Sequence, residues 1–121
     1  MSAPVLIGIG LLGGIGAIAR FVCDTGVSEW AGREFPYGTF AVNILGSFLL
    51  GMFVGAALGA DAYRLAGTGL LGAFTTFSTW ALESHRLGEE GRLRVGLVNF
   101  AVSLLFGVIA AWAGRRVGAQ L

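Results

Sequence analysis

This sequence has few charged residues. Only 12% of its 121 residues are charged, whereas an average soluble domain has about 25%, and the mean hydropathy is +0.79. All eight arginines and all seven acidic residues lie outside four uncharged runs, residues 1–19, 40–60, 65–82 and 95–114. Each run has roughly the 20 residues that a helix needs to cross a bilayer. The sequence therefore predicts an all-α membrane protein with four transmembrane helices and no soluble domain.

Other scarcities exclude several classes of function. The single cysteine, Cys23, excludes an intrachain disulfide. The single histidine, His85, lies at a span end beside Glu83 and Arg86, so we expect an interfacial polar residue rather than a metal ligand. No phosphate-binding loop or catalytic carboxylate pair is present, so we expect no enzyme. A net charge of +1 gives no reason to propose a nucleic-acid partner. No basic residue precedes the first apolar run, which argues against a cleaved signal peptide.

We expect one four-helix domain over residues 1–121, with spans at about 3–23, 36–60, 64–86 and 94–115. An even number of spans puts both termini on the same side of the membrane. That side carries three of the arginines and the other side carries five. Because the orientation of a membrane protein follows this bias, so weak a difference allows the chain to insert in both orientations.

Glycine is abundant, with 21 residues. In the second span, Gly51, Gly55 and Gly59 recur every four residues, and Gly10 and Gly14 do so in the first span. Small residues at this spacing let two helix backbones approach closely in lipid. The triple in the second span is therefore predicted to be a helix-packing surface, whereas the shorter pair is equally consistent with glycine that is simply tolerated in a membrane helix.

The middle of the third span is unusually polar. Four of the five residues 75–79 carry a hydroxyl group, and Gly67, Gly69 and Gly72 come shortly before them. A single hydroxyl can bond back to the preceding helical turn, but this combination predicts a helix that breaks near the middle of the membrane. Such a break frees backbone carbonyls, which then need water, protein or a hard cation as partner.

The second and fourth spans also contain polar residues inside the membrane. Asn43 and Ser47 lie in the second span, and Asn99 and Ser103 lie one turn apart in the fourth. Polar groups inside a membrane are costly and need a reason. They are consistent with a narrow ion path, and equally with hydrogen bonds that hold the spans together.

Three segments, residues 13–21, 38–51 and 69–83, resemble in order and spacing the motifs of the Fluc (CrcB) fluoride channels. The resemblance implies a fluoride-selective channel that passively exports fluoride from the cytoplasm and so relieves its toxicity. It also implies a multi-pass protein of the plasma membrane. Its partners would be fluoride, the lipid bilayer and a second, antiparallel copy of the chain.

The resemblance further implies a structural sodium ion at the centre of the dimer, which is not transported. Its ligands would be the backbone carbonyls of Gly72 and Thr75 from each copy. Two carbonyls from each of two copies make four oxygen ligands, which suits a hard cation.

The resemblance also assigns a fluoride pathway. Asn43 matches a pore-lining asparagine, whose amide can donate to an anion, and Phe77 matches an aromatic residue of the anion site. The edge of a phenyl ring is electropositive, so it can face fluoride without capturing it. Ser78, Thr79 and Ser103 match a track of hydroxyl groups that can replace lost water.

Two positions depart from the family pattern, although we include both in the pathway. Trp80 stands where the family usually has phenylalanine, and Asn99 stands where it often has tyrosine. A different, paralogous subunit would explain both departures, so a heterodimeric channel is an alternative. A small multidrug-type antiporter is a further alternative, but such transporters need an acidic residue inside the first span, and residues 1–19 contain none.

Overall fold

The computed structural model describes residues 1–76 and 78–121, with the backbone alone for residue 78, and these residues form helices and no strand. Three long helices are α1 (Ala3–Ala31), α2 (Tyr37–Gly55) and α6 (Leu93–Gly118). Between α2 and α6 lie α3 (Ala60–Tyr63), the π-helix η1 (Arg64–Leu71), α4 (Gly72–Phe74) and α5 (Ser78–Glu89). The predicted all-α class is confirmed.

Three of these helices, α1, α2 and α6, are long and apolar enough to cross a membrane. The third predicted span corresponds to the series from α3 to α5. Helix α1 continues to Ala31, well past the expected end of its span near residue 23, because nothing before Gly32 stops it. Gly32 has a φ of 91°, a left-handed conformation that glycine adopts without strain and that ends the helix.

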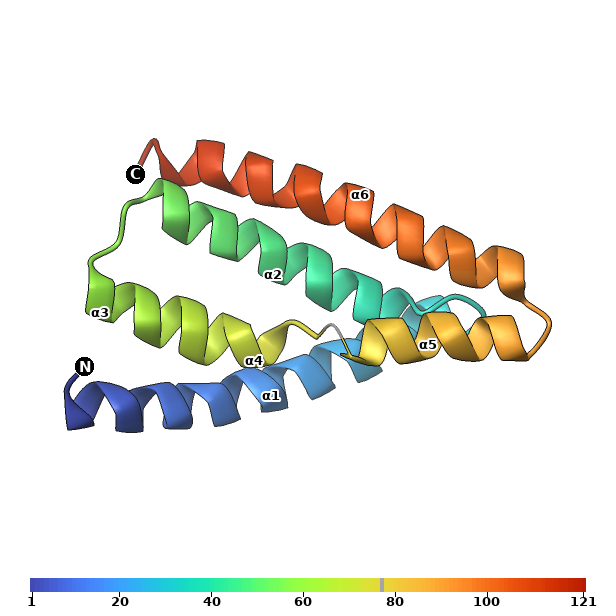
Figure 1. Ribbon diagram of the computed structural model, residues 1–121, viewed down its shortest axis with the longest axis horizontal. Coiled ribbons are helices and arrows are strands. Elements are labelled where there is room, and N and C mark those ends of the chain that lie inside the picture. The colour runs from blue at the N-terminus through green and yellow to red at the C-terminus, as the bar shows by residue number, and fades with distance from the viewer. Residues whose placement is uncertain (77) are drawn as a thin grey trace.

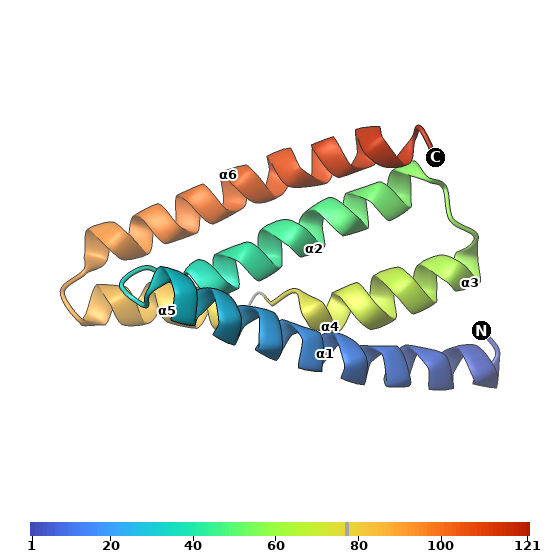
Figure 2. The same ribbon diagram turned by 180° about the vertical axis from the view of Figure 1, so that it is seen from behind.

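The helices form four rods that run along the same long axis (Figures 1 and 2). Helix α2 packs mainly against α6, α1 packs against η1 and α4, and α5 packs against α6. Both termini lie at one end of the molecule with the α2–α3 link. The α1–α2 loop and the α5–α6 turn lie at the other end, where the Arg92 guanidinium donates to the Glu34 carbonyl.

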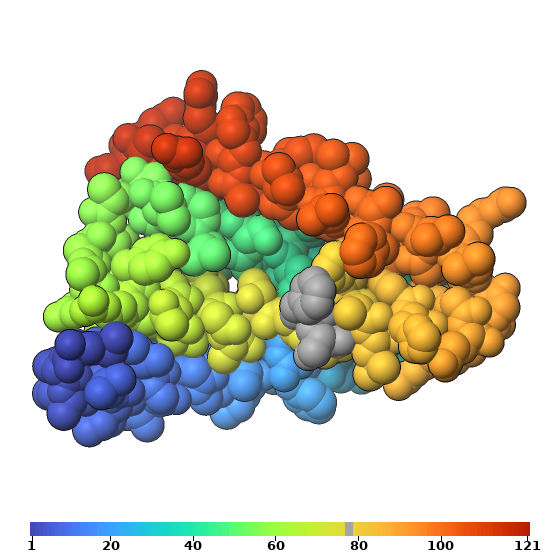
Figure 3. All heavy atoms as spheres, in the orientation of Figure 1, coloured from blue at the N-terminus to red at the C-terminus, as the bar shows by residue number. Residues whose placement is uncertain are grey.

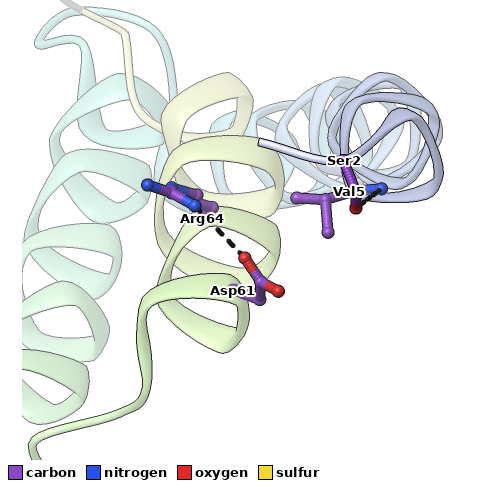
Figure 4. A network of polar contacts seen from close by, with 4 residues as sticks. All are labelled: Ser2, Val5, Asp61 and Arg64. Carbon is purple, nitrogen blue, oxygen red and sulfur yellow. Dashed lines mark hydrogen bonds and ion pairs between the residues drawn. The ribbon is translucent and has the colours of Figure 1, made fainter.

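Short polar contacts fix the chain at the end that carries the termini (Figure 4). The hydroxyl of Ser2 caps α1 by accepting the Val5 amide at 3.4 Å. Asp61, in α3, forms an ion pair of 3.2 Å with Arg64, the first residue of η1. Both partners of this pair are exposed, so it adds little to stability.

Glycine makes the close contact between α2 and α6 possible. A Cβ added to Gly51 would overlap the Ala111 carbonyl, and one added to Gly114 would overlap the Phe48 carbonyl. The same reciprocal contact recurs one turn away at Gly55 and Gly118. The predicted ridge is thus confirmed at Gly51 and Gly55. It is wrong at Gly59, which lies beyond the end of α2. Gly10 and Gly14 meet no neighbouring helix among the described residues, because α1 approaches η1 through Gly13 and Gly16.

Large apolar side chains cover the outer faces of α1 and α6. Leu11 and Ile18 on α1 are 68% and 67% exposed, and Val108 and Trp112 on α6 are 62% and 61% exposed. A water-soluble monomer rarely exposes a continuous apolar surface of this extent. These faces are suited to lipid or to another subunit, as expected of a multi-pass membrane protein.

Candidate functional site

The chain leaves the helical conformation in the middle of the third span, directly after α4. Thr75 has an extended backbone, with a φ of −77° and a ψ of 156°. The side-chain amide of Asn43, on α2, pairs with the backbone of Thr76 in both directions. Nδ2 donates to the Thr76 carbonyl at 2.8 Å, and the Thr76 amide donates to Oδ1 at 2.8 Å. One side chain therefore satisfies both polar groups of a non-helical residue, as lipid requires.

Hydroxyl groups complete the hydrogen bonding around this break. Thr75 Oγ1 donates back to the Leu71 carbonyl at 3.0 Å. Thr76 Oγ1 accepts the Thr79 amide at 3.3 Å, three residues ahead, as a helix N-cap does. Thr75 also packs against α2 at Gly46, where a Cβ would overlap its methyl group. The predicted break is thus built from the threonines of the polar cluster and from α2.

The same hydrogen bonds determine which backbone carbonyls the break releases. In a continuous α-helix, the amides of Thr76 and Thr79 would bond to the carbonyls of Gly72 and Thr75, four residues earlier. Here those amides bond to Asn43 Oδ1 and Thr76 Oγ1 instead. The two carbonyls predicted to hold sodium are therefore among those that lose their helical amide partners at the break. Among the described residues, no cluster of three His, Cys, Asp or Glu side chains offers an alternative metal site.

An open pocket of about 410 Å³ lies beside the break, between α2, α6 and the start of α5. We call it the break pocket, and it is lined by Asn43, Ser47, Leu50, Thr75, Thr76, Trp80, Ser103, Leu104, Gly107, Val108 and Ala111. Figure 3 shows the surface recessed between α6 and the η1–α4 segment, with α2 at the bottom of the recess. None of these lining residues carries a formal charge.

Asn99, on α6, lies behind the wall of the break pocket and is 1% exposed. Its Nδ2 donates to Ser84 Oγ at 2.7 Å, and its Oδ1 accepts from Ser103 Oγ at 3.2 Å. Ser84 Oγ in turn donates to the Trp80 carbonyl at 2.9 Å. Asn99 thus joins α6 to α5 through the nitrogen of its amide, while the amide oxygen bonds to Ser103 one turn further along α6.

Trp80 forms part of the pocket wall. Its ring stacks on Phe100, with centroids 4.7 Å apart and planes 17° from parallel. Its indole Nε1 donates to the Asn99 carbonyl at 3.4 Å, a long and therefore weak hydrogen bond. Both contacts hold the indole against α6.

The structure thus brings together three of the predicted pathway residues, Asn43, Trp80 and Ser103, around one pocket. Asn99 supports that pocket from behind, and Thr79 is half-buried in the first turn of α5 outside the lining set. Phe77 lies outside the described residues, and the side chain of Ser78 is not described.

Two features escaped the sequence analysis. Thr39 Oγ1, at the start of α2, donates to Glu83 Oε1 on α5 at 2.5 Å, and Ser84 links Trp80 to Asn99. An acidic residue at the edge of an uncharged run was a signal for the first. The second joins residues of different helices, and the sequence carries no periodicity that would reveal it.

Comparison with known proteins gives a consistent result. The family model described as "CrcB-like protein, Camphor Resistance (CrcB)" matches residues 7–115. The chain is 50% identical over 120 residues to "Fluoride-specific ion channel FluC 2" of Mycolicibacterium paratuberculosis, covering 99% of this chain and 98% of the relative. It is 49% identical over 117 residues to the protein of the same name from Mycobacterium tuberculosis, covering 97% and 93%. It is also 44% identical to "Fluoride-specific ion channel FluC 1" of Symbiobacterium thermophilum, covering 91% and 94%.

Proposed function

Because the chain belongs to the CrcB family and is a multi-pass protein of the plasma membrane, we propose that it is a fluoride-selective ion channel. The relatives that match nearly the whole of this chain are named as fluoride-specific ion channels. The proposed activity is passive: fluoride leaves the cytoplasm down its gradient, and no chemical step occurs.

One observation carries this proposal, the chemistry of the break pocket. Its polar lining consists of amide, hydroxyl and indole side chains without a formal charge. Thr76, which caps α5, and Trp80, in the first turn of α5, both line it. The pocket therefore lies at a helix N-terminus, where the helix dipole favours an anion.

A pocket of this kind suits fluoride transport better than a charged one. Fluoride is small and strongly hydrated, so a purely apolar pore would exclude it. A lysine or arginine in the pocket would bind it too tightly to release it. Neutral polar groups such as the Asn43 amide and the Ser103 hydroxyl lie between these extremes. The edges of aromatic rings, as expected of Phe77 and Trp80, do the same.

We infer that the channel is a dimer of two antiparallel copies around a structural sodium ion. The carbonyls of Gly72 and Thr75, freed by the break, are suited to hold that cation. Gly72 is exposed on the single chain, which leaves its side of α4 accessible to a partner. The bound cation would add a local positive charge and join the two broken spans.

The test is an efflux assay with the purified chain in liposomes. Potassium fluoride or potassium chloride is trapped inside, valinomycin releases the counter-charge, and ion-selective electrodes record the anion outside. Fast release of fluoride with little release of chloride is expected. Equal release of both anions would contradict the proposal. No fluoride release from this chain alone, but release after addition of a paralogous subunit, would show a heterodimeric channel.

A further inference from the structure

The hydrogen bonds behind the break pocket form one continuous chain with a direction. Ser103 donates to Asn99 Oδ1, Asn99 Nδ2 donates to Ser84 Oγ, and Ser84 donates to the Trp80 carbonyl. Each hydroxyl has a single proton, so each can donate only once. Because Ser103 uses its proton on Asn99, its hydroxyl offers the break pocket only lone pairs. Lone pairs repel an anion, so this arrangement has the wrong polarity for fluoride.

The same atoms support a second arrangement of opposite direction. The oxygen and nitrogen of an amide have nearly the same size, so reversing the Asn99 amide changes its hydrogen bonds and hardly its shape. In the reversed state Nδ2 donates to Ser103 Oγ, and Oδ1 accepts from Ser84. The Ser103 proton is then free to point into the pocket. The Trp80 carbonyl loses the Ser84 hydroxyl but keeps the amide bond of a helical carbonyl.

We propose that Asn99 is a positioning residue whose amide reverses when an anion enters the break pocket, and so turns the Ser103 hydroxyl from acceptor to donor. This inference rests on the proposed fluoride channel. Asn99 itself is 1% exposed, so it acts through Ser103 rather than by touching the ion. With the pocket empty, the first arrangement keeps Ser103, Asn99 and Ser84 hydrogen-bonded to one another. With an anion in the pocket, the reversed arrangement keeps the same three side chains bonded. No buried polar group is left unpaired in either state, which keeps the free-energy difference between them small.

The nature of this side chain matters because only an amide has a donor and an acceptor at equivalent positions. Leucine has a similar volume and neither group. Aspartate offers two acceptors, so the Ser103 hydroxyl would always donate to it and would never turn its proton toward the pocket. The Asn99→Leu variant is therefore the cleaner probe, since it removes the relay without adding charge.

Nuclear magnetic resonance of the full chain in detergent micelles gives a direct test, because the sequence contains only two asparagines, Asn43 and Asn99. Labelling with ¹⁵N-asparagine yields two side-chain amide signals, which single substitutions assign. Fluoride is expected to shift the Asn99 signal, although that side chain does not contact the pocket. Ser103→Ala should abolish this response, whereas Ser47→Ala, a change elsewhere in the same pocket, should preserve it.

Fluoride efflux from liposomes supplies the second measurement. Ser103→Ala should slow efflux by about three- to tenfold, the factor that one hydrogen bond represents. Asn99→Leu should slow it little, because it removes the acceptor that holds the Ser103 proton away from the pocket. The double variant should be no slower than Ser103→Ala alone, because Asn99 acts only through that hydroxyl. Additive losses would overturn the inference and make Asn99 an independent packing residue.

The two measurements separate this inference from the proposed function. Selective efflux with an Asn99 signal that ignores fluoride would overturn the relay and leave the channel standing. A fluoride response at Asn99 that depends on Ser103, without efflux, would support the relay as an anion-binding device and refute conduction by this chain. A silent Asn99 signal without efflux would refute both.

Discussion

Asn43 and Thr76 are joined by two hydrogen bonds of 2.8 Å each, one in each direction, between a side-chain amide of α2 and the backbone of the break. The geometry is that of one rung between paired strands, with a side chain replacing one of the backbones. A residue predicted to face the anion therefore also maintains the break that forms the pocket. Its Nδ2 has a second proton, which neither of these two bonds uses.

Replacing Asn43 with alanine should therefore affect both stability and transport. The Thr76 amide and carbonyl would each lose a partner, at a cost of about 1–3 kcal/mol in the free energy of unfolding. We expect lower thermal stability in detergent, followed by tryptophan fluorescence, together with slower fluoride efflux. Ser47→Ala, in the same pocket, is the matched control and should change stability by less than about 0.5 kcal/mol. Normal stability with slow efflux would restrict Asn43 to an anion-binding role.

The glycine contact between α2 and α6 predicts different results for two chemically identical substitutions. Gly51→Ala places a methyl group against the Ala111 carbonyl and should cost about 1–3 kcal/mol through overpacking. Gly10→Ala meets open space and should be neutral or stabilising by up to about 1 kcal/mol, since alanine favours a helix. Thermal unfolding of both variants in the same detergent measures the difference. Equal destabilisation would show that α1 packs through Gly10 against a surface outside the single chain.

Substitutions of Trp80 test whether its ring or its indole N–H matters. Phenylalanine keeps an aromatic ring for the stack on Phe100 and loses the 3.4 Å bond to the Asn99 carbonyl. We expect Trp80→Phe to lose less than about 1 kcal/mol of stability and to slow fluoride efflux only slightly. Trp80→Leu removes the ring and should slow efflux much more. An equal loss in both variants would assign the role to the indole N–H.

Removal of sodium should reveal the proposed cation site without any substitution. A ligand that binds only the folded state stabilises it by about 2.7 kcal/mol at a concentration 100 times its dissociation constant. The unfolding temperature should therefore rise steadily with sodium at constant ionic strength and fall when choline, which is too large for carbonyl ligation, replaces it. An unfolding temperature that is the same in sodium and choline would contradict the site.

The sequence predicted the parts of the fold that depend on composition. Long uncharged runs identify spans because a charge in hydrocarbon is costly, and the cluster at residues 75–79 identified the break because hydroxyls and glycine suit a poor helix. The positions of Asn43, Trp80 and Ser103 around one pocket followed from family resemblance, and the structure brings them together.

What could not be predicted depends on which helices become neighbours. Gly10 and Gly14 have the spacing of a packing ridge, yet α1 meets η1 through a different face of the helix, the one that carries Gly13. Likewise, the sequence places Ser103 one turn from Asn99, but only the position of α5 shows that the amide nitrogen of Asn99 bonds to Ser84. Spacing specifies a helix face, whereas the partner of that face is decided by tertiary packing.

The break also has a consequence for how the protein enters the membrane. The stretch from Ala60 to Phe74 and the 12-residue α5 each extend only about 20 Å, too short for either to cross a hydrocarbon core of about 30 Å alone. The two halves must therefore cross together, with the non-helical residue Thr76 between them. Asn43 is synthesised 33 residues before Thr76, so the side chain that satisfies this backbone leaves the ribosome before the backbone itself does.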